Sequence, residues 1–393
     1  MTTNSISARG LNRSTLARQL LLGRAAVGAE EALRRVVALQ AQQPASPYVA
    51  LWNRVAGFEP ADLDAVFGGF RAVKSTLMRI TLHAVHVDDY RDFRAAVEPT
   101  VRGARLGDPR FRASGLVAQD ADALLPELLK MAERPCTAGE LTKWFTGRAG
   151  PDGEKLVTAS RMLRQYAPLW HAPVGGAPWS YASDKRQLFV AAEAGRRPAL
   201  REPAVVAEGL RALLRRYLAG FGPASVADMA QFALVQKGRV RAALDEDLER
   251  LTGPGGEVLY DVPGGALPDA EVPAPPRLMA MWDSTLLAYA DRGRVLPPEY
   301  RAHVTRVNGD VLPTVLVDGY VAGVWRLAAD GGGVEVGAFR PLRKGTWAAL
   351  ESEAEGVSRL LTERDPGTYR RYDHWWDKGL PVVEGRVLAS GRT

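Results

Sequence analysis

Apolar and polar positions in the first ninety residues follow first a helical and then an extended period. Leu16, Leu20 and Leu21 recur at the spacing of one helix face, and Asn12 precedes them as a residue able to cap a helix. The elements predicted next are helices at residues 30–39 and 60–67 and strands at 72–78 and 80–87. Helices followed by a β-hairpin are typical of a winged helix-turn-helix.

The same layout recurs twice further along the chain. Thr137 and Glu140, and again Ser225 and Asp228, have the spacing of a capping box ahead of an apolar run. A basic helix is predicted at 154–165 and a more acidic one at 239–251, followed by extended or glycine-turned segments at 170–179 and 258–262. We therefore predict three tandem winged-helix units, the third a scaffold because its acidic helix would repel phosphates.

The remainder of the chain is predicted to be rich in β-structure. A segment rich in proline and glycine at 263–276 is expected to be a linker, and strands are predicted at 311–316, 320–327 and 334–339 before a helix at 347–361. The predicted fold class is α+β, with three tandem winged helix-turn-helix units followed by a β-rich C-terminal domain. The expected domain boundaries are 1–115, 116–198, 199–276 and 277–393.

Charge and cysteine content narrow the class of protein. The 393 residues carry a formal charge of +6, which favours a polyanionic partner, although an arginine-rich composition accounts for it equally well. The single cysteine, Cys136, excludes an intramolecular disulfide, and no signal peptide or membrane-spanning stretch stands out. We expect a cytoplasmic protein.

A pair of glutamines, Gln40-Ala41-Gln42, follows the second predicted helix and precedes a proline-containing turn. Two glutamines separated by one apolar residue can direct both amides into one cleft where the backbone is extended or turning. Taken alone, the pair would more commonly be surface glutamines. Gln43, before Pro44, is interpreted as a turn residue.

This motif resembles the Gln-apolar-Gln motif of the AlkZ/YcaQ-like DNA glycosylases. The resemblance extends in order through about residues 11–345, and its further segments are 11–13, 79–83, 282–292, 308–313 and 317–326. Two positions depart from the family pattern, His86 and Tyr289, where a small polar residue and a histidine are expected.

The resemblance implies a DNA glycosylase that excises bulky N7-alkylguanine and N3-alkyladenine adducts and unhooks interstrand crosslinks, in repair or in self-resistance to a genotoxic natural product. It assigns Gln40 and Gln42 as catalytic residues. An N7-alkylated guanine already carries positive charge, so its departure needs no strong acid. Two amides can then position a water and direct dipoles at the developing sugar cation.

Other polar residues are candidates for binding DNA or the damaged base. For His83 a buried strand histidine is nearly as plausible, Asp283 and Arg292 have common structural roles, and the loop with His303 and Arg306 is equally compatible with a plain exposed hairpin. The complete set of DNA- or substrate-binding candidates is His83, Lys155, Arg161, Arg164, Asp283, Arg292, His303 and Arg306.

No metal site is expected, because no Cys/His cluster has zinc-ligand spacing. We also expect no cofactor, no membrane partner, double-stranded DNA with alkylated purines as substrate, and a monomer. The alternative function is a non-catalytic winged-helix DNA-binding regulator, and a scaffold without affinity for DNA is a third. The glutamine motif favours the enzyme over both.

Overall fold

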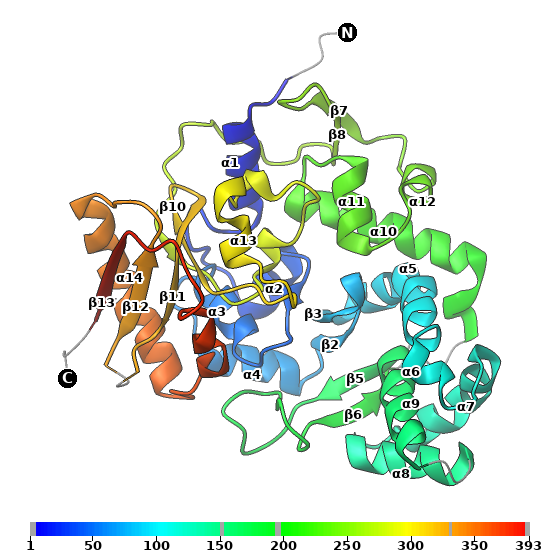
Figure 1. Ribbon diagram of the computed structural model, residues 1–393. Coiled ribbons are helices and arrows are strands. Elements are labelled where there is room, and N and C mark those ends of the chain that lie inside the picture. Colours follow the sequence, from blue (N-terminus) through cyan, green and yellow to red (C-terminus); the bar gives the residue numbers. More distant parts are fainter. Residues whose placement is uncertain (1–4, 150–152, 193–197, 330–331, 390–393) are drawn as a thin grey trace. The chain divides into compact units, whose positions relative to one another are not determined.

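The chain forms two compact units, each built from segments that are discontinuous in the sequence. The computed structural model describes residues 5–149, 153–192, 198–329 and 332–389 (Figure 1). Unit 1 comprises residues 1–65, 216–229 and 246–393, and unit 2 comprises 66–215 and 230–245. The mixture of helices and strands confirms the α+β class, whereas the three winged-helix units and the four domain boundaries stay predictions.

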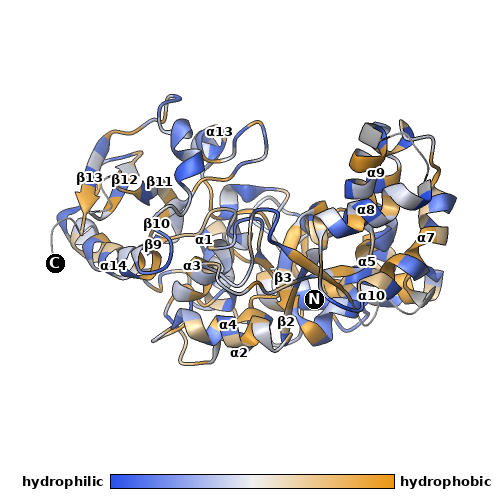
Figure 2. Ribbon diagram, turned by 90° about the horizontal axis from the view of Figure 1, so that it is seen from below, coloured by the Kyte–Doolittle hydropathy of each residue, from blue (hydrophilic) through white to orange (hydrophobic). Residues whose placement is uncertain are grey.

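A five-stranded antiparallel sheet and one long helix form much of unit 1. Its strand order is β13-β12-β11-β10-β9, and β11 pairs along its length with β10 and β12. Helix α14 turns a row of apolar side chains inward at helical spacing, so hydrophobic and hydrophilic residues alternate around it (Figure 2). The bounds are β9 Arg277–Leu278, β10 Thr314–Val317, β11 Tyr320–Leu327, β12 Val334–Ala338, α14 Lys344–Thr362 and β13 Glu384–Leu388.

The first helix of unit 1 begins earlier than the sequence predicts. Ser7 caps it, with its hydroxyl oxygen accepting a hydrogen bond from Gly10 N at 3.0 Å, so the prediction of Asn12 as the cap is wrong. Asn12 is buried instead, and its amide donates to the carbonyls of Arg294 and Gly319. The other elements of unit 1 are α1 Ala8–Arg18, α2 Ala29–Arg35, β1 Leu39–Gln40, α3 Ser46–Trp52, β7 Glu249–Thr252, β8 Val258–Asp261, η4 Ser284–Leu286, η5 Arg292–Arg294, η6 Pro298–Tyr300, α13 Arg301–Val304 and η7 Arg370–Trp375.

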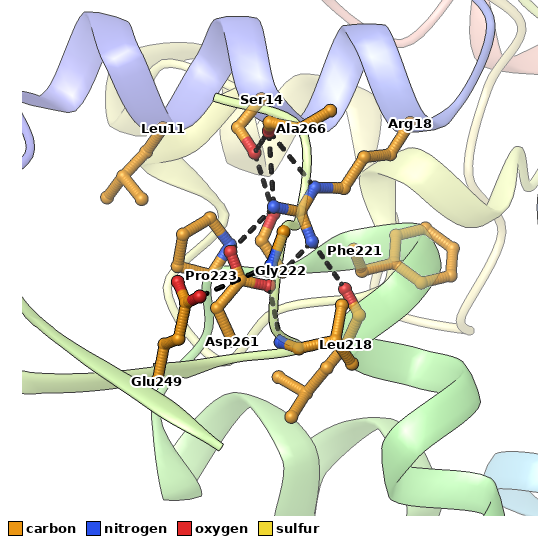
Figure 3. A network of polar contacts seen from close by, with 12 residues as sticks. Leu11, Ser14, Arg18, Leu218, Phe221, Gly222, Pro223, Glu249, Asp261 and Ala266 are labelled. Carbon is orange, nitrogen blue, oxygen red and sulfur yellow. Dashed lines mark hydrogen bonds and ion pairs between the residues drawn. The ribbon is translucent and has the colours of Figure 1, made fainter. Parts of the chain in front are cut away.

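A buried ion pair joins α1 to the hairpin of β7 and β8 (Figure 3). Both nitrogens at the end of the Arg18 guanidinium lie 2.6 Å from the carboxylate oxygens of Asp261, and the same group donates to the carbonyls of Leu218 and Ala266. Gly222 passes so close that a Cβ atom there would lie 2.8 Å from Arg18 Nη1. The network thus requires glycine at that position and connects four segments far apart in the sequence.

Unit 2 contains an antiparallel sheet in the order β3-β2-β5-β6-β4. The predicted hairpin is confirmed as β2 and β3, and helix α5 begins directly after it. His86 is the N-cap of α5, since its Nδ1 accepts from Asp88 N at 3.3 Å, so the predicted cap by Asp88 and Asp89 is wrong. The bounds are β2 Ala72–Thr76, η1 Met78–Ile80, β3 Leu82–His86, α5 Val87–Leu106, β4 Cys136–Thr137, β5 Leu169–Ala172 and β6 Leu188–Ala191.

Both predicted capping boxes are present. The hydroxyl oxygen of Thr137 accepts from Glu140 N at 3.1 Å while the Glu140 carboxylate accepts from Thr137 N at 2.7 Å, and Ser225 and Asp228 repeat both bonds. The basic helix is confirmed as α9, whereas the helix predicted at 239–251 is wrong beyond residue 242, where α12 ends. The remaining helices are α4 Pro60–Gly68, α6 Pro109–Arg112, α7 Ala118–Met131, α8 Ala138–Ala149, α9 Gly153–Tyr166, η3 Pro198–Arg201, α10 Pro203–Phe221, α11 Val226–Ala233 and α12 Lys237–Ala242.

One lysine is buried in the sheet of unit 2. Lys74 on β2 is 2% exposed, and its Nζ lies 4.9 Å from the centre of the Tyr181 ring. Its partner across the strand pair is His171 on β5. Burial lowers the pKa of Lys74 to about 7. No carboxylate among the described residues forms an ion pair with this amine, so its charge is compensated by the aromatic ring alone.

None of the helices within the described ranges combines the length and the apolar composition needed to cross a membrane.

Candidate active site

The two glutamines of the motif lie together in unit 1, just after an unusual backbone turn. Val37 adopts a left-handed conformation with φ of 74°, which is uncommon for a β-branched residue and which ends α2 before the predicted residue 39. The chain then extends through β1 and turns at Gln42. Gln40 is 4% exposed, whereas the side chain of Gln42 is exposed.

Hydrogen bonds fix the direction of both amides. The backbone N–H of Gln42 can only donate, so the Gln40 atom that it meets at 3.0 Å is the carbonyl oxygen Oε1. The NH₂ group of Gln40 therefore faces Gln42, where it donates to Oε1. Gln42 retains its own NH₂ group and one lone pair of Oε1, which no described residue uses. The arrangement presents one donor and one acceptor at an exposed position, oriented from below by a buried amide.

The backbone before the motif is held by the segment that contains Asp283. Ser284 Oγ donates to the carbonyl of Ala38 at 2.8 Å. Asp283, which is 3% exposed, receives two hydrogen bonds of 2.8 and 2.9 Å from the guanidinium of Arg54, which also reaches Thr285 Oγ1. The carboxylate of Asp283 is thus occupied by a protein partner, and its expected contact with DNA stays a prediction.

The turn after the motif is fixed by two tyrosines near the C-terminus. Gln43 Nε2 donates to the hydroxyl of Tyr372 at 2.8 Å, so the third glutamine does more than occupy a turn. Tyr369, which is buried, contacts Ser46 at the start of α3, with 2.9 Å between the two hydroxyl oxygens. Burial raises the pKa of both phenols above its usual range, so both are neutral at physiological pH. Sequence patterns gave no signal for these contacts.

The predicted loop at 301–310 forms a tight hairpin turn that contacts the same C-terminal segment. Arg306 N donates to Asp310 O at 2.8 Å, while the indole N–H of Trp375 donates to the carboxylate of Asp310 at 2.9 Å. The guanidinium of Arg306 lies 4.8 Å above the Trp375 ring and donates to its carbonyl oxygen. Val307 at the tip is fully exposed. The turn is therefore anchored at its base and free at its tip.

Arg292 and His303 lie in the polypeptide leading to this turn. Arg292 Nη1 donates to Thr305 Oγ1 at 3.0 Å, and burial lowers the pKa of its guanidinium, which still leaves it charged. Asp291 is not paired with it: this carboxylate caps η5 by accepting from Gly293 N at 2.9 Å. The half-buried ring of His303 lies 6.4 Å from that of Phe339. Contact of either residue with DNA stays a prediction.

His83 belongs to unit 2 and has no exposed surface. Its Nδ1 donates to the carbonyl of Thr81 at 3.2 Å, and its Nε2 accepts from Arg79 Nη2 at 3.1 Å. Burial and the neighbouring guanidinium lower its pKa to about 3, so the ring is neutral. The structure thus matches the buried strand histidine that the sequence left open, and its contact with DNA stays a prediction.

The three basic candidates on α9 differ in exposure. Lys155 and Arg161 are exposed on the polar face of the helix, as predicted. Arg164 is half-buried, with its guanidinium 5.0 Å above the ring of Phe189, and burial lowers its pKa. Lys155 and Arg161 are therefore better placed than Arg164 to meet a phosphate.

Within the ranges that the structure describes, no group of three or more His, Cys, Asp or Glu side chains is arranged to hold a metal ion. Burial raises the pKa of the Cys136 thiol to about 11, so it is not a thiolate at neutral pH.

Comparison with known proteins places the whole arrangement in one family. The model of the DNA glycosylase AlkZ-like family matches residues 33–360, which include the glutamine motif and the hairpin turn. An interstrand DNA cross-link repair glycosylase of Streptomyces sahachiroi is 24% identical over 357 residues, covering 87% of this chain and 93% of the relative. The solved structure of the DNA glycosylase AlkZ of Streptomyces sahachiroi matches with a TM-score of 0.73 and 22% identity, covering 91% of this chain and 97% of that one. The chain belongs to the AlkZ-like DNA glycosylase family.

Proposed function

We propose that this protein is a monofunctional DNA glycosylase that hydrolyses the N-glycosidic bond of N7-alkylguanine and N3-alkyladenine in double-stranded DNA, including bulky and crosslinked adducts. The observation that carries the proposal is the oriented amide pair of Gln40 and Gln42. The family membership supports a glycosylase, and the name of the Streptomyces relative supports a crosslinked substrate.

The amide pair suits a leaving group that is already charged. Gln42 can accept a hydrogen bond from a water through Oε1 and donate through its NH₂ group to a sugar or phosphate oxygen. Gln40 holds that amide in place, which lowers the cost of positioning the water near C1′. Neither amide is a strong acid or base. The site therefore fits a cationic purine, which departs as a neutral base once the bond breaks.

Binding of DNA is assigned to exposed cations in both units. In unit 1 the hairpin turn carries Arg306 beside its exposed tip, and in unit 2 the helix α9 carries Lys155 and Arg161. Helix α9 follows a capped helix and precedes the antiparallel pair of β5 and β6, which supports a winged-helix interpretation of this part of the chain. Phosphate contacts from such residues position the protein without reading the base sequence.

Leaving-group charge provides the test of the proposed chemistry. We expect release of cationic N7- and N3-alkylpurines and no release of uracil, 8-oxoguanine or O6-alkylguanine. Bulk on N7 should be tolerated, because the reaction needs access to C1′ and not a tight pocket around a flipped base. The measurement is formation of abasic sites in one panel of oligonucleotides with matched duplex stability.

Two outcomes of this panel would contradict the proposal in different ways. Efficient release of uracil would show a true general acid or a closed base pocket, and would remove the amide mechanism. Tight binding to DNA without release of any base would instead support a non-catalytic DNA-binding regulator.

A second expectation concerns α9. Replacing Lys155 and Arg161 by alanine should flatten the plot of log K against log salt by roughly 0.9 for each phosphate that the variant no longer binds, and adding Arg164→Ala should change it less, because that residue is half-buried. The measurement is fluorescence anisotropy of a duplex at several salt concentrations. The control is the Lys237→Ala/Arg241→Ala variant, which removes two exposed charges from α12. Equal slopes in the two double variants would move the DNA-binding surface away from α9.

A further inference from the structure

The C-terminal segment 370–378 lies beyond the part of the chain that the family model matches, yet it is built around the glutamine motif. Within it Tyr372 and Trp375 are buried, while Arg371, His374 and Lys378 are exposed. The spacing of these three basic residues is that of one face of a helical turn. The segment thus pairs an aromatic layer with an outer row of basic side chains.

Two of these cations are stacked on the aromatic rings. The guanidinium carbon of Arg371 lies 4.7 Å from the centre of the Tyr372 ring, and Lys378 Nζ lies 4.8 Å from that of Trp375. Such contacts hold a cation in position through its face and leave its N–H groups free to donate. Among the described residues no carboxylate forms an ion pair with either one, including the neighbouring Asp373 and Asp377.

The same rings connect the cations to the catalytic candidates. The hydroxyl of Tyr372 accepts from the amide of Gln43, the residue that follows Gln42. The indole of Trp375 donates to Asp310 in the hairpin turn and is covered by Arg306. Arg371 therefore lies one ring away from the glutamine motif, and Lys378 one ring away from the hairpin turn.

We propose that Arg371 and Lys378 bind the phosphates of the DNA strand that flank the damaged nucleotide at the glutamine motif. The proposal rests on the proposed function, because it takes duplex DNA as the ligand. Two positive charges without acidic partners, fixed beside an exposed donor and acceptor, complement a polyanionic backbone. An arginine guanidinium can also bind one phosphate through two N–H groups, which is a stronger contact than a neutral donor provides.

The experiment compares two variants that each lose one arginine and one lysine. Arg371→Ala/Lys378→Ala removes the proposed contacts, and Lys344→Ala/Arg359→Ala removes two exposed charges from α14 in the same unit. Binding to a duplex with one N7-alkylguanine is measured over a range of salt, together with single-turnover base release. We expect the first variant to lower the log–log salt slope by about 1.8 and the second to leave it near the wild-type value. At saturating protein the release rate of the first variant should stay within about tenfold of wild type, because the amide pair is intact.

The outcomes separate this inference from the function on which it rests. Equal slopes in the two variants, with base release intact, would overturn the phosphate contacts and leave the glycosylase. No base release by the wild-type protein, with the slope lowered only in the first variant, would overturn the glycosylase and leave the phosphate contacts. Circular dichroism melting of both variants shows whether either change reflects a loss of folded protein, and the single substitutions Arg371→Lys and Lys378→Gln then give the same comparison with smaller structural change.

Discussion

Replacing Gln42 by alanine is expected to slow release of an N7-alkylguanine by about 10²-fold or more, the loss typical for one preorganised polar group at a reacting centre. Gln40→Ala should have a similar effect through its neighbour, because the buried amide is what orients Gln42. Binding to damaged DNA should change much less. The measurement is single-turnover excision on one defined lesion, together with the affinity of each variant.

The neighbouring glutamine supplies a matched control. Gln43→Ala removes an amide of the same size from the next position and breaks the bond to Tyr372, but leaves the pair of Gln40 and Gln42 untouched. We expect it to cost less than tenfold in the release rate. Wild-type rates in both the Gln40 and the Gln42 variants, with the fold intact, would exclude the glutamines from the mechanism.

The second large effect is on stability. Asp283→Ala is expected to destabilise the protein by about 3–5 kcal/mol, because it leaves the guanidinium of Arg54 buried without its counter-charge. Replacing both partners by apolar residues, as in Arg54→Met/Asp283→Leu, should recover most of this loss. The measurement is urea unfolding followed by far-UV circular dichroism and tryptophan fluorescence.

A surface ion pair provides the comparison for that experiment. Glu384 pairs with Arg386 on the exposed face of β13, and Glu384→Ala should cost at most about 1 kcal/mol. If Asp283→Ala costs no more than this surface variant, the Arg54 guanidinium has found another partner or water, and the ion pair does not hold the segment beneath the glutamine motif.

Local patterns carried the predictions that succeeded. The capping boxes at Thr137 and Ser225 were found because both partners lie within four residues and form the same two hydrogen bonds wherever the motif starts a helix. The strands β11 and β12 and the helix α14 were found because each turns a regular row of apolar residues inward. The glutamine pair was found through its family resemblance, and its geometry could not be derived from spacing.

Contacts over long sequence distances account for the predictions that failed. Asn12 has the chemistry of a helix cap, but two carbonyls far along the chain bind its amide inside α1. The helix predicted at 239–251 continues instead as a strand, since Glu249–Thr252 pairs with Val258–Asp261. The support of the glutamine motif by Tyr372 crosses more than three hundred residues, and no periodicity or motif in the sequence signals such a contact. Nor could linear boundaries describe two units that each draw on separate stretches of the chain.

The buried lysine of unit 2 ties the folding of this protein to proton release. Lys74 has a pKa of about 7 in the folded chain against 10.5 for the free side chain, so between these values the unfolded state binds more protons than the folded one. The fold consequently gains stability as the pH rises from 7 towards 10.5 and carries the full cost of the buried ammonium below 7. An amine that sits over Tyr181 without an acid thus makes alkaline solution, rather than neutral or acidic solution, the condition in which this part of the sheet is most secure.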